Sequence, residues 1–369
     1  MKTITLDKIG SVTRNVRLNR DVRIGDDFPC QAGDVVVVRV LTRKSTYNTL
    51  ELPSGRFSAL NPGDVIAGAL GHRRALSGYA GHVPATLRVG DRLQVLNLGG
   101  VLGVCDASHP DLGPPFECEV LGQALHFPFL AERIGLPANI RQGALEPREQ
   151  IQVGGVPVIA VVGTCMNAGK TAAACALVQE LVRSGRVVHA AKATGVSLRR
   201  DAFGMEDAGA RKTLTFTDLG IVTTSRETAP GAARSLLSHL ASSAAEAAPD
   251  VIVLELGDGL MGDYGVDAIL ESPDIRRCFS AIVLAANDPV GAWGGVERLR
   301  LDYELATTVI TGPATDNIAG TEVITKRTGV PAINARAAPR ALTDEVLRAL
   351  GFADDGRTVR VAGGVSHDE

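Results

Sequence analysis

The chain has 369 residues, of which 45% are hydrophobic and 21% charged, so it is expected to fold rather than to be disordered or a coiled coil. Its formal net charge of −3 gives no overall field to attract nucleic acid or an anionic membrane, and we expect neither as a partner. Aromatic residues make up only 4% against 41 glycines, so packing must depend on small aliphatic side chains and many tight turns.

No segment has the pattern of a membrane span or a secretion signal. The longest apolar runs, at 35–38 and 158–162, are far shorter than the roughly 18 residues that cross a bilayer, and the N-terminus lacks an apolar signal region. We therefore expect a cytoplasmic protein. Six cysteines are scattered without a C-x-x-C pair, so we expect neither a zinc site nor a disulfide framework, and five of them are expected to be small buried side chains.

Residues 1–145 predict a β-rich domain. Short β-type runs each follow a Gly-Asp pair, which is the turn chemistry of a small antiparallel barrel or sandwich; the runs lie at 35–41, 64–69 and 92–98. Basic loops at 71–74 and 78–82 could reach an anionic substrate between two domains, or could be solvated. The proline- and glycine-rich residues 127–150 are interpreted as the connection to a second domain, with room for a short helix.

Residues 146–369 change to an alternation of strands and helices. Continuous apolar runs predict buried parallel strands at 156–162, 187–191, 250–256, 281–286 and 307–311. Helical stretches are predicted at 171–184, 229–247, 296–305 and 319–328. This alternation predicts a doubly wound, mostly parallel α/β domain whose ligands bind at the carboxyl ends of the strands.

A phosphate-binding loop (P-loop) is predicted where the first of these strands meets the first helix. Residues 163–171 read GTCMNAGKT, and small residues in such a loop let successive backbone amides turn toward a phosphate. Lys170 would contact the β and γ phosphates and Thr171 would hold Mg²⁺, while the helix N-terminus faces the same anion. The predicted nucleotide-binding residues are Gly163, Thr164, Asn167, Ala168, Gly169, Lys170, Thr171 and Ala172.

The spacing of this loop departs from the common pattern. Five residues separate Gly163 from Gly169 where four are usual, and Thr164 stands where the first glycine is expected. Cys165 and Met166 are interpreted as loop filler, and a nucleophilic Cys165 is the alternative.

The loop and two further segments resemble a known family. The run VVGTCMNAGKTAAACAL is similar to the loop of dethiobiotin synthetase, which has the same shifted glycine, and to that of N-acetyl-D-glutamate kinase-type P-loop proteins. Residues 187–195 resemble the synthetase strand whose lysine contacts substrate and phosphate, here Lys192, and residues 253–259 resemble the segment whose glutamate binds metal, here Glu255. The resemblance covers about residues 155–335 and implies an ATP-dependent P-loop fold. Dethiobiotin synthesis itself is not predicted, because Cys165 replaces an acidic residue of that family's loop.

The positions of Glu255 and Lys192 support these roles. Glu255 ends an apolar strand, where its carboxylate would face the loop and bind Mg²⁺ directly or through water; a solvated strand-end acid is the alternative. Lys192 would neutralise charge on a transferring phosphoryl group, with a surface lysine as the alternative. Asp258 could orient a substrate or only form the turn. We assign Lys170, Lys192 and Glu255 as catalytic residues.

The polar segment 195–224 is interpreted either as a mobile loop over the site or as a solvated connection with a short helix. As a loop it would supply Asp201 or Asp207 to the metal shell, and Asp207 is named as the third metal ligand beside Thr171 and Glu255. Its arginines would then hold an acidic substrate; they are Arg199, Arg200 and Arg211.

Three later segments are expected at the same edge of the sheet. The glycine-rich residues 286–295 are expected to form a loop in which Trp293 contacts a substrate or partner, or else caps the core. Residues 311–316 and 330–334 fall where related proteins hold the nucleotide base. The sequence has no N-K-x-D guanine signature there, which favours ATP over GTP.

These observations predict a Mg²⁺- and ATP-dependent enzyme that phosphorylates or activates a small, amino-acid-like carboxylic acid, as a kinase or a ligase. Catalysis would depend on positioning and electrostatics. A P-loop NTPase switch or metallochaperone that regulates a protein partner is the alternative, and a non-catalytic metabolite sensor is a third. The expected partner is a small anionic carboxylate, and a homodimer is left open.

Overall fold

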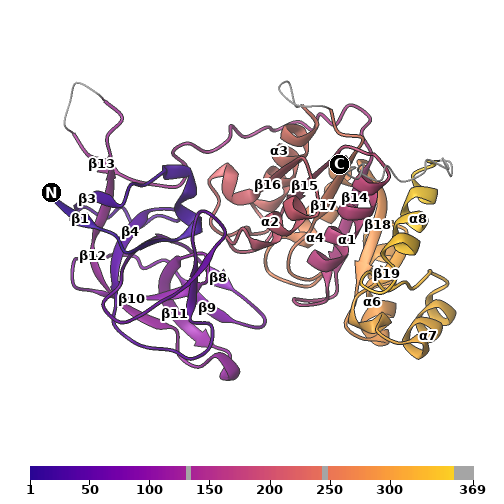
Figure 1. The fold of residues 1–369 in the computed structure, drawn as a ribbon, viewed down its shortest axis with the longest axis horizontal. Helices are drawn as coiled ribbons and strands as arrows, with labels where there is room; N and C mark the ends of the chain where they lie inside the picture. Colours follow the sequence, from indigo (N-terminus) through magenta and orange to yellow (C-terminus); the bar gives the residue numbers. More distant parts are fainter. Residues whose placement is uncertain (130–133, 243–247, 353–369) are drawn as a thin grey trace, which may run out of the picture.

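The computed structural model describes residues 1–129, 134–242 and 248–352, and it contains two large sheets that lie side by side (Figure 1). An eleven-stranded, mostly antiparallel sheet is built before residue 138, and a six-stranded parallel sheet is built after residue 157. The predicted fold class, an α/β domain with a β-rich N-terminal region, is therefore confirmed. The position of the domain limit, between residues 145 and 146, stays a prediction.

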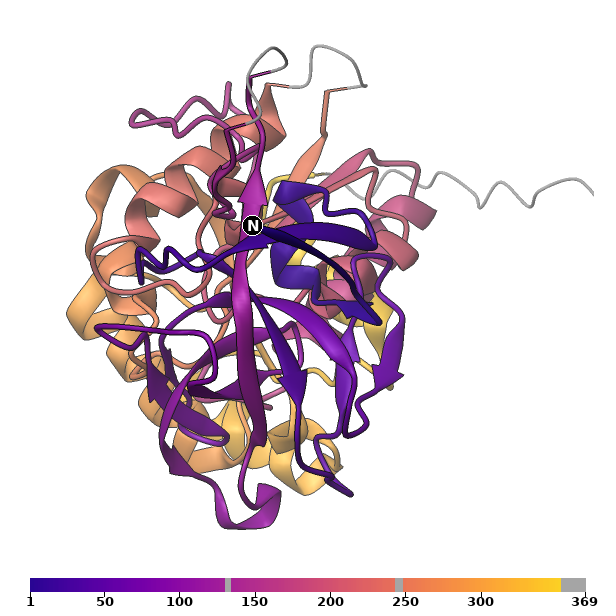
Figure 2. The ribbon, with the colours of Figure 1, turned by 90° about the vertical axis from the view of Figure 1, so that its left-hand side faces the viewer.

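The centre of the N-terminal sheet is a closed ring of strands. β10 (Arg92–Asn97) pairs with both β11 (Val101–Ser108) and β12 (Phe116–His126). β12 then pairs with β4 (Val35–Val40), β4 pairs with β7 (Val65–Leu70), and β7 returns to β11. These pairings make a small barrel, which faces the viewer in Figure 2.

The remaining N-terminal elements extend this barrel or lie beside it. The added strands are β1 (Lys2–Thr5), β2 (Lys8–Ile9), β3 (Asp21–Gly25), β8 (Arg73–Arg74), β9 (Tyr79–His82) and β13 (Leu136–Pro137). A separate hairpin consists of β5 (Thr49–Glu51) and β6 (Phe57–Ala59). Two short 3-10 helices are η1 (Ser11–Val16) and η2 (Pro110–Leu112).

The Gly-Asp pairs form the turns that the sequence predicts. Gly33, Gly63 and Gly90 each have a φ of +93°, a left-handed conformation that glycine adopts without steric cost. In each turn the side chain of the following aspartate accepts a hydrogen bond of 2.7 Å from the backbone amide three residues before it. The same turn therefore leads into β4, β7 and β10, which are three of the five strands in the ring.

The second sheet is parallel, with the strand order β16-β15-β17-β14-β18-β19. Its strands are β14 (Val158–Gly163), β15 (Val188–Lys192), β16 (Lys212–Thr215), β17 (Val251–Glu255), β18 (Phe279–Ala285) and β19 (Val309–Thr311). β14 lies between β17 and β18, so the predicted P-loop follows a central strand with a neighbour on each side.

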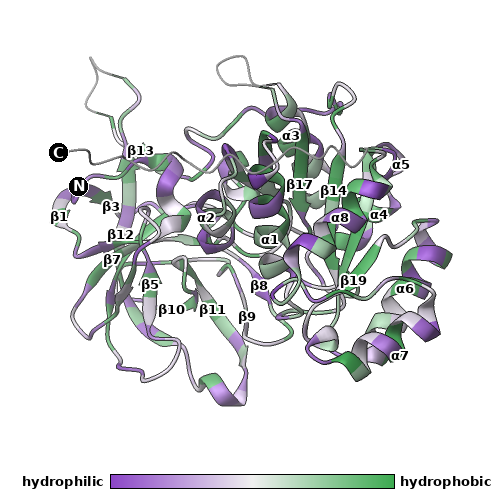
Figure 3. Cartoon of the chain, turned by 45° about the vertical axis from the view of Figure 1, so that its right-hand side comes forward, coloured by the Kyte–Doolittle hydropathy of each residue, from purple (hydrophilic) through white to green (hydrophobic). Residues whose placement is uncertain are grey.

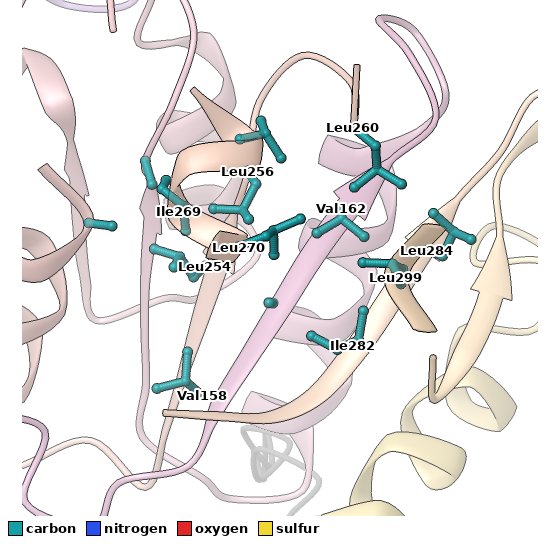
Figure 4. Packing of buried hydrophobic residues seen from close by; sticks show 14 of the residues in the cluster. Val158, Val162, Leu254, Leu256, Leu260, Ile269, Leu270, Ile282, Leu284 and Leu299 are labelled. Carbon is teal, nitrogen blue, oxygen red and sulfur yellow. The ribbon is translucent and has the colours of Figure 1, made fainter. Parts of the chain in front are cut away.

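Helices cover both faces of this sheet. Along β14, Val158, Ala160 and Val162 belong to one hydrophobic cluster, and Ile159 and Val161 belong to the other. The first cluster includes residues of α3 (Ala229–Ala241), α4 (Val266–Glu271), α5 (Pro273–Arg276), α6 (Pro289–Tyr303) and α7 (Ile318–Thr328) (Figure 4). The second includes residues of α1 (Lys170–Arg183), α2 (Arg200–Asp207) and α8 (Pro339–Ala349). Burial on both faces explains the continuous apolar strands, which Figure 3 shows in green.

Two parts of this domain differ from the prediction. Segment 195–224, expected as a loop or a connection with a short helix, contains α2, the edge strand β16 and the 3-10 helix η3 (Phe216–Leu219). The glycine-rich residues 286–295 are mostly helical, because α6 begins at Pro289 and Asp288 caps it by accepting a hydrogen bond from the Gly291 amide at 2.8 Å. The end of the predicted helix 229–247 lies outside the described residues at 243–247. A further 3-10 turn in this domain is η4 (Pro313–Thr315).

The cysteines are less buried than expected. All six are free, and Cys118 alone among them is fully buried, whereas the other five are partly exposed. Within residues 1–129, 134–242 and 248–352, none of the helices is both long and apolar enough to cross a membrane.

The barrel packs directly on segment 195–224 of the parallel domain. The Arg199 amide donates to Glu51 of the barrel at 2.8 Å, and the Thr223 hydroxyl donates to the carbonyl of His72 at 2.6 Å. Gly99 approaches so closely that a methyl group there would overlap the carbonyl oxygen of Ser197. The barrel therefore forms one wall beside the carboxyl ends of β15 and β17.

Candidate functional site

The loop between β14 and α1 has a conformation that only certain residues allow. Gly169 has a φ of +92° and Asn167 a φ of +60°, both in the left-handed region that favours glycine and tolerates asparagine. At Gly163, a methyl group would lie 2.8 Å from Cγ of Lys170, so glycine here makes room for the lysine side chain. The helix starts at Lys170, immediately after Gly169, which places its N-terminus against the loop.

Lys170 lies inside this loop with only 6% of its surface exposed. Its Nζ donates to the carbonyl of Cys165 at 2.8 Å, so the ammonium group is held across the loop. Burial lowers the pKa of Lys170, and the nearby Glu255 carboxylate opposes that effect. A bound phosphate would supply a further negative charge to a lysine that is otherwise costly to bury.

Thr171 and Glu255 face each other across the strand edge. The Thr171 hydroxyl donates to Oε1 of Glu255 at 3.0 Å, and Glu255 is aligned with Val161 of β14 in the parallel register. Glu255 is 1% exposed, and its Oε2 has no hydrogen-bond partner among the described residues. Burial, then the nearby Asp201 carboxylate, raises the pKa of Glu255.

This pair fits a magnesium ion. A hydroxyl and a carboxylate are hard oxygen ligands, and the unpartnered Oε2 is a buried acceptor that a cation would satisfy. Mg²⁺ in such sites keeps waters and binds substrate phosphates, so it needs few protein ligands. The described part of the chain has no group of three or more His, Cys, Asp or Glu side chains that could hold a metal ion.

Lys192 reaches the same edge at the end of β15 but is already paired. It lies beside Glu255 in the register of the parallel sheet and forms an ion pair and hydrogen bond with Asp201, in the first turn of α2. Burial lowers the pKa of Lys192, but the carboxylates of Asp201 and Glu255 outweigh burial and raise it. For Asp201 the two effects are reversed: burial raises its pKa, but the charge of Lys192 outweighs burial and lowers it. The lysine is therefore a buried, charged side chain and not the surface residue of the alternative interpretation.

Asp207 is not brought to this cluster. It ends α2 and is exposed, six residues beyond Asp201, which is about 9 Å further along a helix axis. The sequence offered Asp201 or Asp207 as the third acidic residue of the site. The helix places Asp201, and not Asp207, beside Lys192. Of the arginines, Arg199 is buried with its guanidinium 4.5 Å from the ring of Phe203, and Arg200 is exposed.

Three other predicted loop residues border a small pocket beside the loop. Ala172, Asn167 and Gly169 border a small pocket of about 60 Å³ together with Thr311, Gly312, Pro313, Asp316, Asn334, Ala335 and Arg336. Asn334 donates to Asp316 at 2.9 Å within this pocket. Both segments that were expected to hold the base, 311–316 and 330–334, therefore lie next to the predicted phosphate loop.

The loop is also held by contacts of Thr164, Cys165 and Ala168 with neighbouring residues. The Thr164 amide donates to the carbonyl of Ala285 at 3.0 Å, and Ala168 is buried. The Cys165 sulfur accepts a hydrogen bond from Asn287 at 3.0 Å, which fits a loop residue held in place. Trp293 is 51% exposed on α6, so it does not cap the core.

A cavity of about 400 Å³, here called the loop cavity, opens between the loop and the barrel. The parallel domain contributes residues such as Asn167, Lys192 and Asp258, and the barrel contributes residues such as Arg73 and Asn97. Apart from the loop at 71–74, sequence reasoning missed this barrel contribution, since its residues lie more than 50 positions before the phosphate loop. The Gly-His-Arg-Arg loop at 71–74 carried the signal, but only Arg73 of it lines the loop cavity.

A second, larger cavity of about 980 Å³ lies on the other side of Arg73 and Tyr264, which line both cavities. The basic loops at 71–74 and 78–82 contribute His72, Arg74 and His82 to it. Arg74 is bound there to Asp263 at 3.0 Å. These loops therefore do lie between the two sheets, although mostly away from the phosphate loop.

The central strand, the glycine-containing loop and the helix with Lys170 and Thr171 define a P-loop protein of the α/β class. No protein-family model matches the chain, and no curated protein matches it.

Solved structures give weak likenesses. Cell division protein FtsY from Thermotoga maritima has a TM-score of 0.37 at 16% identity, covering 55% of this chain and 72% of that one. Signal recognition particle 54 kDa protein from Aeropyrum pernix, in complex with GDP, has a TM-score of 0.33 at 18% identity, covering 56% and 49%. A DUF1611 family protein from Anabaena variabilis has a TM-score of 0.36 at 14% identity, covering 57% and 63%. Scores this low assign the chain to no family.

Proposed function

We propose that the chain is a nucleoside triphosphatase of the P-loop class, which binds a magnesium nucleoside triphosphate on residues 163–171 and breaks the bond to its γ-phosphate. The observation that carries this proposal is the meeting of Lys170, Thr171 and Glu255 at one edge of the parallel sheet. Each of the three is partly or fully buried, which is costly for a lysine and a glutamate without a ligand.

The charge of each site residue suggests which part of the magnesium nucleotide it would bind. Lys170 and the amides at the start of α1 would hold the phosphates, because both present positive charge to an anion. Thr171 and Glu255 would hold the magnesium ion, which when bound neutralises charge on the phosphate oxygens. Lys192, kept charged by Asp201, would stabilise the negative charge that develops on the transferred group.

The test is nucleotide binding and turnover with and without Mg²⁺. Wild-type protein is expected to bind a fluorescent ATP or GTP analogue and to release phosphate only when Mg²⁺ is present. Lys170→Ala should lose both properties, whereas Lys326→Ala, an exposed lysine on α7, should keep them. Binding that is equal in both variants would remove the site assignment.

The identity of the base is part of the same experiment. We propose adenine, because the sequence lacks the N-K-x-D signature of guanine-binding proteins. Competition of unlabelled ATP against GTP for the fluorescent analogue measures the preference, and tighter binding of GTP would contradict it.

A second candidate is transfer of the phosphoryl group to a small molecule, as in the kinase or ligase that the resemblance to dethiobiotin synthetase and N-acetyl-D-glutamate kinase-type proteins implies. The loop cavity favours it, because a switch that answers to a protein partner needs no enclosed space beside the phosphates. Turnover that rises with small carboxylic acids would support it. Turnover that rises only with an added protein would support a switch or metallochaperone instead.

A further inference from the structure

Asp258 lies in the turn after β17, packed against the phosphate loop. The next residue, Gly259, is so close that a methyl group there would lie 2.7 Å from Cα of Cys165, and the Leu260 amide donates to Gly163 at 2.9 Å. Asp258 is 7% exposed, and neither of its carboxylate oxygens has a hydrogen-bond partner among the described residues. Its φ of +76° is a conformation that costs an aspartate energy. An unpaired buried carboxylate on strained backbone is typical of a functional residue.

Asp258 is also one of the residues that line the loop cavity, with its carboxylate oxygens buried at the wall. Three cations and three carboxylates line this cavity; they are Arg73, Lys192, Arg200, Asp111, Asp201 and Asp258. The charges balance, and Lys192 is already paired with Asp201. Tyr47, Ser77 and Asn97 add neutral hydrogen-bonding groups to the wall. The cavity thus suits a small polar molecule that is neutral or zwitterionic better than a strongly charged anion.

We propose that the loop cavity holds a small phosphoryl acceptor that carries a hydroxyl group, and that Asp258 accepts the proton of this hydroxyl. This inference rests on the proposed function, since the phosphoryl donor is the nucleoside triphosphate on residues 163–171. The acceptor oxygen forms a bond to the γ-phosphorus while the bond from that phosphorus to the β-phosphate oxygen breaks. The products are a phosphate monoester and a nucleoside diphosphate, and the hydroxyl proton passes to Asp258 and then to solvent.

Proton chemistry is the reason to choose a hydroxyl acceptor over the carboxylic acid that the sequence predicts. A carboxylate is already ionised at neutral pH and attacks phosphorus without a base, whereas a hydroxyl must lose a proton. Burial raises the pKa of Asp258 to about 6; Lys170 and Lys192 act against this rise and Asp263 adds to it, while Tyr264 also lies near. A carboxylate with this pKa is ionised at pH 7.5 and is a stronger base than an exposed aspartate.

The first test compares Asp258→Asn with Asp263→Asn in the full chain. Asp263 is a matched control because it is an exposed carboxylate five residues away, bound to Arg74, and it does not line the loop cavity. Asp258→Asn should lower kcat for nucleotide turnover about 100-fold or more, the usual contribution of a general base, while the Kd of the magnesium nucleotide stays within about threefold. Asp263→Asn should leave the Kd unchanged and lower kcat less than about threefold, because Asp263 only adds to the raised pKa of Asp258. An Asp258→Asn enzyme with normal kcat would overturn the role of Asp258.

The second test needs no variant. Wild-type protein with its magnesium nucleotide is incubated with a panel of polyols, sugars and hydroxy amino acids, and with acetate, alanine and glutamate as probes without a hydroxyl, and ³¹P NMR follows the products. A phosphate monoester is expected from a hydroxyl-bearing probe and from no other. Inorganic phosphate alone throughout the panel, or an acyl phosphate trapped by hydroxylamine, would overturn the inference. Wild-type protein that binds no magnesium nucleotide would overturn the proposed function instead.

Discussion

The barrel and the ligand edge of the parallel sheet both depend on glycine, but for different physical reasons. In the barrel, Gly63 and Gly90 have a φ of +93°, and a methyl group at either would meet no atom within 4 Å. At the sheet edge, Gly257 and Gly259 have no positive φ, yet a methyl group at Gly259 would lie 2.7 Å from the carbonyl oxygen of Thr164. Gly63 and Gly90 are therefore required by backbone conformation, and Gly257 and Gly259 by lack of space.

This difference separates what is needed for folding from what is needed for binding. A turn glycine such as Gly63 acts locally, on the direction of its own strand. An edge glycine allows two segments that are distant in sequence to touch, here the turn after β17 and the loop after β14. Substitution of Gly63 or Gly90 should therefore reduce stability alone, whereas substitution of Gly257 or Gly259 should reduce both stability and ligand binding.

The largest expected effect is at the ion pair of the edge. Asp201→Ala leaves Lys192, whose side chain is 13% exposed, without its ion-pair partner and should lower the free energy of unfolding by about 3 kcal/mol. Glu119→Ala in the barrel removes an exposed ion pair with Arg39 at 3.1 Å and should cost about 1 kcal/mol or less. Urea unfolding of both variants measures the difference. Equal losses of unfolding free energy in the two variants would show that the ion pair at the sheet edge is no more important for stability than the one in the barrel.

The ion pair between Lys192 and Asp201 stabilises the protein only over a limited pH range. The pKa of Asp201 lies below its ordinary 3.8, so its contribution to stability is present above that pH and is lost as the pH falls further. The pKa of Lys192 lies above 10.5, so its contribution is present below that pH and is lost as the pH rises through the raised value. The stability difference between wild type and Asp201→Ala, measured by urea unfolding, should therefore be smaller below about pH 4 and above about pH 10 than at neutral pH.

Gly259→Ala comes next in size. Because the added methyl group meets backbone atoms of Thr164 and Cys165, the loop must shift, which should cost about 2 to 3 kcal/mol. The shift should also weaken binding of the magnesium nucleotide at least tenfold, as measured with a fluorescent analogue. A variant that is destabilised but binds normally would break the proposed link between this turn and the loop.

Gly63→Ala is the barrel counterpart. Alanine has space here but adopts a positive φ at a cost of about 1 kcal/mol. Nucleotide binding should be unchanged at a temperature where the variant is folded. Weaker binding by this variant would show that the barrel turn acts on the site, contrary to the division drawn between the two regions.

The sequence predicts the structure best where the conformation of a short segment depends on that segment alone. The Gly-Asp turns, the apolar strands and the loop at 163–171 are local patterns, and the structure has turns and strands where they predict them. Strand β16 was missed because its sequence KTLT is short and polar at a sheet edge. The start of α6 was missed because the Asp-Pro cap outweighs the three glycines that suggested a loop.

The site is less predictable than the fold, because its residues meet through tertiary packing. The choice between Asp201 and Asp207 depends on where α2 lies relative to β15, which no local pattern contains. The loop cavity depends on how the barrel docks, through contacts such as that of Arg199 with Glu51 across 148 positions. The sequence left open whether Asp258 orients a ligand or only forms the turn, and its missing hydrogen-bond partners became visible in three dimensions.

The smallest expected effect tests whether Asp258 is kept for activity at the expense of stability. Its pKa is raised to about 6, so the protonated form favours folding, and that contribution is present below about pH 4 and is lost as the pH rises through 6. Asp258→Asn, which cannot ionise, should therefore be more stable than wild type by about 0.5 to 1 kcal/mol at pH 7.5, with the difference shrinking toward pH 5. Asp64→Asn should instead be less stable at both pH values, since Asp64 accepts hydrogen bonds from Lys8 and from the Asn61 amide in its turn. Urea unfolding at the two pH values decides the matter, because an Asp258→Asn protein that loses stability at pH 7.5 would mean that this carboxylate is a structural group, like its barrel counterpart.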